Sequence, residues 1–302
     1  MKDPAEFLQS DDFIQEGANP APGVLVLACT VGDDYDNPKN RVVLLKDDSW
    51  LDFRYSSGAL VSADAAGDGA AYVLSERGTV IQFDWRSPAD TTQLKASCQL
   101  MRNPAVDSIG PLRRLRLLGG EVFTAGSAGQ VYRLRGGLFE PLPLLSVSGE
   151  DITIEDLSGS GFHDLLAVST DGYAAHFDGS AWRLLDLPSN AGLNRICRLP
   201  QGGYAIAGYK STLLLGQQDR WQSVAPIDNR RSYYGVASSG GDVFVAYPGG
   251  IDVFDGTGLR ELPVPADPER EFTTLRGGPD GVWSLCGHHI DLVTAAGLRH
   301  GP

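Results

Sequence analysis

Cysteine, methionine and lysine are scarce in this chain of 302 residues, which has 4 Cys, 2 Met and 5 Lys against 20 Arg. The cysteines (Cys29, Cys98, Cys197 and Cys286) are far apart and form no CxxC pair, which disfavours a zinc site. We expect reduced structural thiols in a cytoplasmic protein. The N-terminal region is acidic rather than signal-like, and no run of 18 apolar residues exists, so we predict neither a secretory signal nor a membrane span.

Local enzyme motifs are also missing. We find no Gly-x-Ser-x-Gly elbow, no HExxH, no Walker loop and no GxGxxG between a strand and a helix. Propeller hydrolases and lyases use dispersed carboxylates or histidines, so this absence weakens an enzymatic interpretation without removing it. We predict no cofactor.

Acidic residues outnumber basic ones, and the formal net charge is −13. Such a surface repels nucleic acid and anionic membranes and speeds association with cationic partners. The alternative is that the charge serves solubility alone.

The sequence does contain a repeat, in which a Gly-rich turn is followed by a short apolar strand. Six intervals between the anchor glycines average 43 residues. The anchors are Gly23, Gly69, Gly120, Gly161, Gly203, Gly241 and Gly281. Repeats of this length indicate solenoids, propellers or arrays.

Each unit contains four short strands joined by tight turns. In one such unit, the first strand is expected at residues 233–237, the second at 243–247, the third at 251–254 and the fourth at 259–263. The second strand is apolar on both faces, as a strand buried on two sides should be. No helical pattern of ten or more residues appears.

The Gly-x-aromatic strands and the Asp-Gly-x-x-Trp turns, such as residues 178–182, resemble bacterial WD40-like and quinoprotein-like propeller repeats. The resemblance covers about residues 13–300 and implies an all-β, seven-bladed β-propeller of four-stranded antiparallel blades, with six blades as the alternative. We expect one domain over residues 1–302. The last unit looks short, so we expect Glu6–Ser10 to add an outer strand that closes the ring.

Residues 156–164 resemble the calcium loop of integrin-type propeller repeats. That resemblance implies oxygen ligands at Asp156, Ser158, Ser160 and Asp164. Serines replace the acidic residues at its two middle positions, which removes charge. The alternative is a metal-free turn held by hydrogen bonds.

An acidic insert lies between the expected strands at residues 24–29 and 41–45. Its carboxylates and aromatic ring suit a basic partner, or it is simply a solvated loop tip. The residues are Asp33, Asp34, Tyr35 and Asp36.

Other charged groups lie in or just before the entering strands, which in a propeller line the channel. We assign Glu150, Asp151, Arg230, Arg231 and Tyr233 to a partner-binding face. The same assignment would place the arginines of residues 112–117, and Asn194 and Arg195, near the channel. The alternative is that these charges pair with one another across it. His288 and His289 are adjacent on a strand and point to opposite sides, so they do not chelate together.

By analogy, a compact, acidic propeller without catalytic motifs fits an immunity protein. We predict that it occludes a co-inherited toxin, of the nuclease type and of a type VI or contact-dependent system. Its partner would then be a basic toxin or effector domain, and the protein a monomer. The alternative is a hydrolase or lyase acting on a sugar or lactone at the channel mouth, and a third interpretation is a scaffold subunit.

Overall fold

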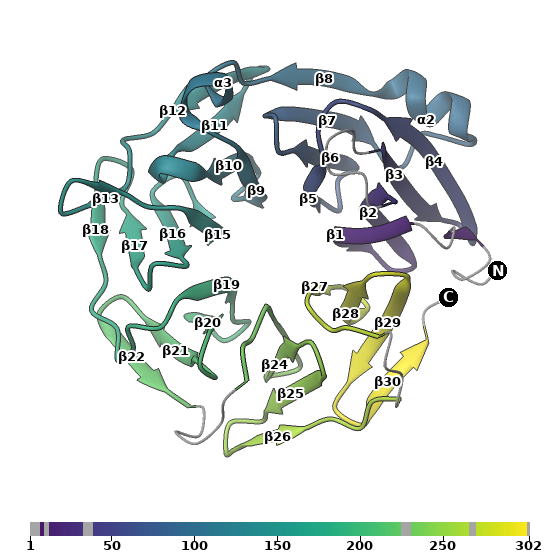
Figure 1. Ribbon diagram of the computed structural model, residues 1–302. Coiled ribbons are helices and arrows are strands. Elements are labelled where there is room, and N and C mark those ends of the chain that lie inside the picture. Colours follow the sequence, from purple (N-terminus) through teal and green to yellow (C-terminus); the bar gives the residue numbers. More distant parts are fainter. Residues whose placement is uncertain (1–6, 9–11, 33–38, 225–230, 266–269, 301–302) are drawn as a thin grey trace.

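Seven four-stranded antiparallel sheets are arranged around a central axis in the computed structural model (Figure 1). The structure describes residues 7–8, 12–32, 39–224, 231–265 and 270–300. The predicted seven-bladed β-propeller is therefore confirmed, and the six-bladed alternative is wrong. Within each blade the four strands follow one another along the chain.

The strands of the first four blades have these bounds. Blade 1 contains β1 (Asp12–Ala21), β2 (Val24–Val31), β3 (Lys39–Lys46) and β4 (Ser49–Tyr55). Blade 2 contains β5 (Leu60–Ala65), β6 (Ala70–Ser75), β7 (Thr79–Asp84) and β8 (Gln99–Arg102). Blade 3 contains β9 (Leu112–Leu118), β10 (Glu121–Gly126), β11 (Val131–Arg135) and β12 (Leu138–Pro141). Blade 4 contains β15 (Ile154–Gly161), β16 (Asp164–Ser169), β17 (Ala174–Phe177) and β18 (Trp182–Leu184).

The remaining elements complete the ring. Blade 5 contains β19 (Leu193–Arg198), β20 (Tyr204–Gly208), β21 (Leu213–Gln217) and β22 (Arg220–Ser223). Blade 6 contains β23 (Gly235–Ser239), β24 (Asp242–Tyr247), β25 (Gly250–Phe254) and β26 (Leu259–Glu261). Blade 7 contains β27 (Leu275–Gly278), β28 (Gly281–Cys286), β29 (His289–Thr294) and β30 (Gly297–His300). Outside the blades lie α2 (Thr91–Ser97), α3 (Val106–Ile109), the 3₁₀ turn η1 (Ser127–Gly129) and the hairpin of β13 (Ser146–Val147) and β14 (Glu150–Asp151).

Seven hydrophobic clusters hold the ring together, one between each pair of neighbouring blades. Strand β2 shows how the sequence builds them. Val24, Val26 and Ala28 pack toward blade 2, whereas the alternate residues Leu25 and Leu27 pack toward blade 7. A second strand is therefore apolar on both faces because each face belongs to a different interface.

The interface between blades 7 and 1 closes the ring through side chains and one main-chain contact. Leu25, Leu27 and Leu285 are fully buried there together with Leu8. The amide of Ile14 donates to the carbonyl of Gly287 at 2.8 Å. Blade 7 has its own short fourth strand, β30. The outer strand expected from Glu6–Ser10 stays a prediction, because Glu6, Gln9 and Ser10 lie outside the described residues.

Polar side chains strengthen this closure. Asn19 of β1 is 5% exposed. Its side-chain Nδ2 donates to the carboxylate of Asp280 at 3.0 Å, and its side-chain Oδ1 accepts a hydrogen bond from the main-chain amide of Asp280 at 3.1 Å. The same carboxylate accepts the amide of Gly23 at 3.0 Å. Blades 1 and 7 are thus bound by a reciprocal pair of hydrogen bonds in addition to their core.

The turns between third and fourth strands use aspartate caps. Asp178 accepts hydrogen bonds from the amides of Ser180 and Ala181 at 2.8 and 3.0 Å, and Asp255 accepts equivalent bonds from Thr257 and Gly258. This is why Asp-Gly recurs in the sequence at these places.

Candidate functional site

The two ends of the ring differ, and antiparallel pairing decides what each end carries. First strands begin, second strands end, third strands begin and fourth strands end at one face, which we call the loop face. It carries the connections between blades at 103–111 and 142–153, and the described residues 231–234, 262–265 and 270–274 of two others. The opposite face, where first strands turn into second strands, we call the turn face.

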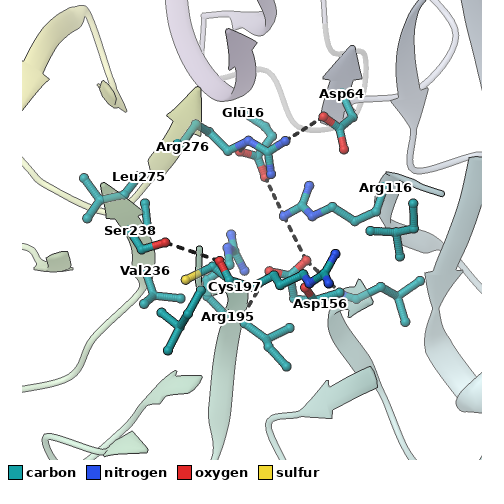
Figure 2. Close-up of a pocket in the computed structure, with 18 of the residues that line it drawn as sticks. Glu16, Asp64, Arg116, Asp156, Arg195, Cys197, Val236, Ser238, Leu275 and Arg276 are labelled. Atoms are coloured by element: carbon teal, nitrogen blue, oxygen red, sulfur yellow. Dashed lines mark hydrogen bonds and ion pairs between the residues drawn. The ribbon is translucent and has the colours of Figure 1, made fainter. Parts of the chain in front are cut away.

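A ring of polar side chains lines the channel, and every blade contributes to it from its first strand. Figure 2 shows these residues converging on one cavity of about 540 Å³. They are Glu16, Asp64, Arg116, Asp156, Arg195, Ser238 and Arg276. The cavity also touches Leu118 and Arg198, which end their strands, and Gly277, the last residue but one of β27, so it opens toward the turn face.

Local irregularities in the first strands help to aim these side chains. The pairing register shifts between Ile14 and Glu16, between Ile154 and Asp156, and between Leu193 and Arg195. A β-bulge inserts a residue and redirects the side chains beside it. Three channel residues therefore follow a bulge at the same place in their blades.

Ion pairs connect the channel residues across blades. Arg116 lies between Asp156, at 2.8 Å, and Glu16, at 3.4 Å (Figure 2). Arg114 bonds Glu16 and lies 3.5 Å from Asp156. The alternative in which these charges pair across the channel is thus the arrangement found for the arginines of β9.

A second link joins blades 7 and 2. Arg276 reaches Asp64 at 2.8 Å, and its Nε lies 3.8 Å from Glu16. Glu16 is 1% exposed and therefore sits among three guanidinium groups in the centre of the ring.

These surroundings decide the protonation of Glu16. Burial alone would raise its pKa, but Arg116, Arg276, Arg114 and, more weakly, Arg195 outweigh burial and lower the pKa to about 2. Glu16 is consequently ionised at neutral pH and cannot act as a general acid there.

Four of the predicted partner-binding residues lie in the described part of the chain, in connections between blades: Glu150, Asp151, Arg231 and Tyr233. Glu150 and Asp151 are exposed on the hairpin β13–β14, just before the entering strand β15, and they lie outside the channel. The residues Asp33, Asp34, Tyr35, Asp36 and Arg230 lie outside the described residues, although the ends of β2 and β3 that bracket residues 33–38 are at this face.

Tyr233 and Arg231, in contrast, form contacts with other side chains of the protein. The ring of Tyr233 is fully buried and its hydroxyl donates to Asp252 at 2.7 Å, so it offers no surface to a partner. Arg231 bonds both Asp252 and Glu261 and lies 4.2 Å from the ring centroid of Tyr247.

The same arrangement recurs one blade later, where Arg270 bonds the buried Asp291. Each arginine precedes its aspartate by 21 residues, and the two pairs are 39 residues apart. These aspartates on β25 and β29 were missed in the sequence, although the doubled spacing was a signal for them.

The calcium-like residues do not converge on one point. Asp156 pairs with Val168 in the strand register and faces the channel, whereas Asp164 pairs with Gly161 at the opposite end of the same hairpin. Asp164 accepts bonds from Ser160 at 2.7 Å and Tyr204 at 3.1 Å and lies 3.0 Å from His176. Ser158 is buried in β15. The arrangement of these residues gives no support to a single calcium loop, and no group of three or more His, Cys, Asp or Glu side chains that could hold a metal ion occurs in the part of the chain that the structure describes.

The fold and the channel define a seven-bladed β-propeller with a charged central cavity. No protein-family model matches the chain. It is similar to the immune protein Tsi7 of Pseudomonas aeruginosa, at 25% identity over 195 residues, which are 62% of this chain and 62% of that protein. The chain thus spans less than two thirds of the length of this relative.

Solved structures support the fold. The WD40 β-propeller domain of Doa1 superposes with a TM-score of 0.67 at 11% identity, covering 93% of this chain and 90% of that one. YCF48 bound to the D1 peptide superposes with a TM-score of 0.66 at 16% identity, covering 93% and 92%. Among the described residues, no helix is long and apolar enough to cross a membrane.

Proposed function

We propose that this chain is a protein-binding propeller of the immunity kind, which neutralises a toxin by covering its active surface. The observation that carries the proposal is the similarity to the immune protein Tsi7 over 195 residues. The propeller fold supports it, because its two faces offer wide surfaces for a partner.

The loop face is the proposed binding surface. Tyr173 is 40% exposed there, and the rings of Tyr209 and Tyr234 meet edge to face with centroids 6.0 Å apart. Tyrosines are enriched at the centres of protein interfaces.

Exposed acids lie on the same face as these rings. Glu150 and Asp151 lie on the β13–β14 hairpin, and Asp171 accepts the amide of Thr153 at 3.4 Å, which links the neighbouring loops of blade 4. The insert Asp33–Asp36 belongs to the proposed surface as well. Negative groups around aromatic ones favour a basic partner, and a nuclease, whose active site attracts phosphate, is the partner class that we propose. Delivery of that toxin by a type VI secretion system is part of the same proposal.

The enzymatic alternative is disfavoured by the channel. Glu16 and Asp156, its most buried carboxylates, are held by arginines, and the low pKa of Glu16 opposes a role in proton transfer.

The first experiment is co-expression with the toxin encoded by the neighbouring open reading frame. We expect growth to be restored and a 1:1 complex to form with purified toxin. Continued toxicity at equal expression would contradict the proposed function.

A second experiment tests the face. Glu150→Lys combined with Asp151→Lys should weaken toxin binding roughly tenfold, because two attractive contacts become repulsive. Glu140→Lys on the outer strand β12 is the matched control and should bind normally. If both variants bind like the parent protein, the loop face is not the binding surface.

A further inference from the structure

The channel carries more positive than negative charge, although the chain as a whole has a net charge of −13. Four arginines of the first strands face three carboxylates. The arginines are Arg114, Arg116, Arg195 and Arg276, and the carboxylates are Glu16, Asp64 and Asp156. One positive charge is therefore left without a counterion in the described channel. Arg198 adds a further guanidinium at the exposed mouth, where water screens it.

Arg195 is the group that lacks a carboxylate. Asp64 is engaged by Arg276, while Asp156 and Glu16 are engaged by Arg114 and Arg116. Among the described residues, no carboxylate lies within 4.0 Å of Arg195, whose Nη1 donates to the carbonyl of Asn194 at 2.9 Å.

The positive charge of Arg195 also affects the neighbouring Arg114. The pKa of Arg114 is lowered to about 9 by burial and then by repulsion from Arg195, despite the attraction of Asp156 and Glu16.

A second donor in the cavity is also incompletely satisfied. The Nε of Arg276 is buried and has no hydrogen-bond acceptor in the described structure, and it lies 3.8 Å from the Oε1 atom of Glu16, which also has no hydrogen-bond partner there. Buried donors without acceptors are costly, so an acceptor entering the cavity would be favoured. The hydroxyl groups of Ser158 and Ser238 line the same space.

We propose that the mouth of the channel binds a carboxylate anion between Arg195 and Arg276. A carboxylate supplies the single negative charge that the channel lacks and two acceptor oxygens suited to guanidinium groups. A phosphate dianion would overcompensate the charge beside Glu16 and Asp156, which disfavours it. The cavity, at about 540 Å³, accommodates a small carboxylic acid or an inserted Asp or Glu side chain.

The test needs only the purified chain and a matched pair of probes. N-Acetylglycine carries one carboxylate, and N-acetylglycinamide is its uncharged counterpart. We expect calorimetry to give a dissociation constant of about 1–10 mM for the acid and at least tenfold weaker binding for the amide. Equal binding of acid and amide, or no binding of the acid at about 50 mM, would overturn the proposal.

Variants locate the site. Arg195→Gln should lose at least tenfold in affinity for N-acetylglycine, Arg195→Lys should retain most of it, and Arg220→Gln on the outer strand β22 should change nothing. The melting temperature of each variant checks that it is folded. Unchanged binding in a folded Arg195→Gln variant would place the anion elsewhere and refute the assignment.

The source of the carboxylate follows from a further comparison. If Arg195→Gln also weakens the complex with the toxin, the partner inserts an acidic side chain from the turn face, and the loop face is then not the binding surface. If only N-acetylglycine is affected, the ligand is a free acid. This inference does not depend on the proposed function, because the probe binds without a toxin. A toxin neutralised normally by a chain that ignores N-acetylglycine would leave the proposed function standing and this inference refuted.

Discussion

Replacement of Glu16 by Gln should destabilise the propeller strongly at neutral pH and hardly at all in acid. The substitution keeps the shape of the side chain but removes the charge that faces Arg114, Arg116 and Arg276. Removing one member of a buried ion pair typically costs about 3–5 kcal/mol.

The pKa of Glu16 supplies an independent magnitude. It falls from 4.5 to about 2 on folding. At about 1.4 kcal/mol per pH unit, this difference contributes on the order of 3 kcal/mol to stability. Because the folded pKa is the lower one, the contribution is complete above pH 4.5 and is lost as the pH falls toward 2.

Urea unfolding of the parent protein and Glu16→Gln at several pH values measures this directly. The difference in the free energy of unfolding should be about 3 kcal/mol at pH 7 and only about 1 kcal/mol at pH 3. Glu140→Gln, which changes an exposed carboxylate, should stay within about 0.5 kcal/mol of the parent at both pH values. A Glu16→Gln variant as stable as the parent at pH 7, or a difference independent of pH, would refute the reasoning.

Three further predictions concern closure, the repeated ion pair and calcium. Asn19→Ala should lower the free energy of unfolding by about 1–3 kcal/mol, because the bonds to Asp280 are lost, whereas Asn190→Ala in an exposed loop should have little effect in the same urea titration. Asp291→Ala should cost about 3 kcal/mol or more, since it leaves the buried Arg270 without its carboxylate. Asp252→Ala should cost less, because Arg231 is only partly buried and keeps Glu261 as a partner, and a larger cost for Asp252→Ala than for Asp291→Ala would contradict this. Millimolar calcium should leave the melting temperature unchanged and give no heat in calorimetry, because arginines occupy the Asp156 carboxylate, and saturable calcium binding abolished by Asp156→Asn would contradict this.

The architecture was predictable from the sequence because it depends on local signals. Turn glycines and two-sided apolar strands repeat along the chain, and a run such as Val24–Cys29 has to be buried on both faces. The last unit looked short in the sequence because its outer strand, β30, has only four residues.

The site was only partly predictable because it is assembled by contacts between distant blades. Glu16 and Arg114 are 98 residues apart, and β-bulges that no composition reveals help to turn the first of them into the channel. Tyr233 shows the opposite error. A tyrosine beside arginines looks like an interface residue, but a buried acceptor, Asp252, makes the same pattern structural.

Continuous blades have a consequence for how the ring could be opened. In the described part of the chain no sheet borrows a strand from the other end of the sequence, so the junction between β1 and the strands of blade 7 is a side-chain packing interface to which a few hydrogen bonds are added. The molecule is in this sense a linear array of repeats bent until its ends touch, and its stability approximates a sum over equivalent interfaces. A circular permutant, in which the two ends are joined at this junction and the chain is opened between blades 1 and 2, should therefore form the same ring.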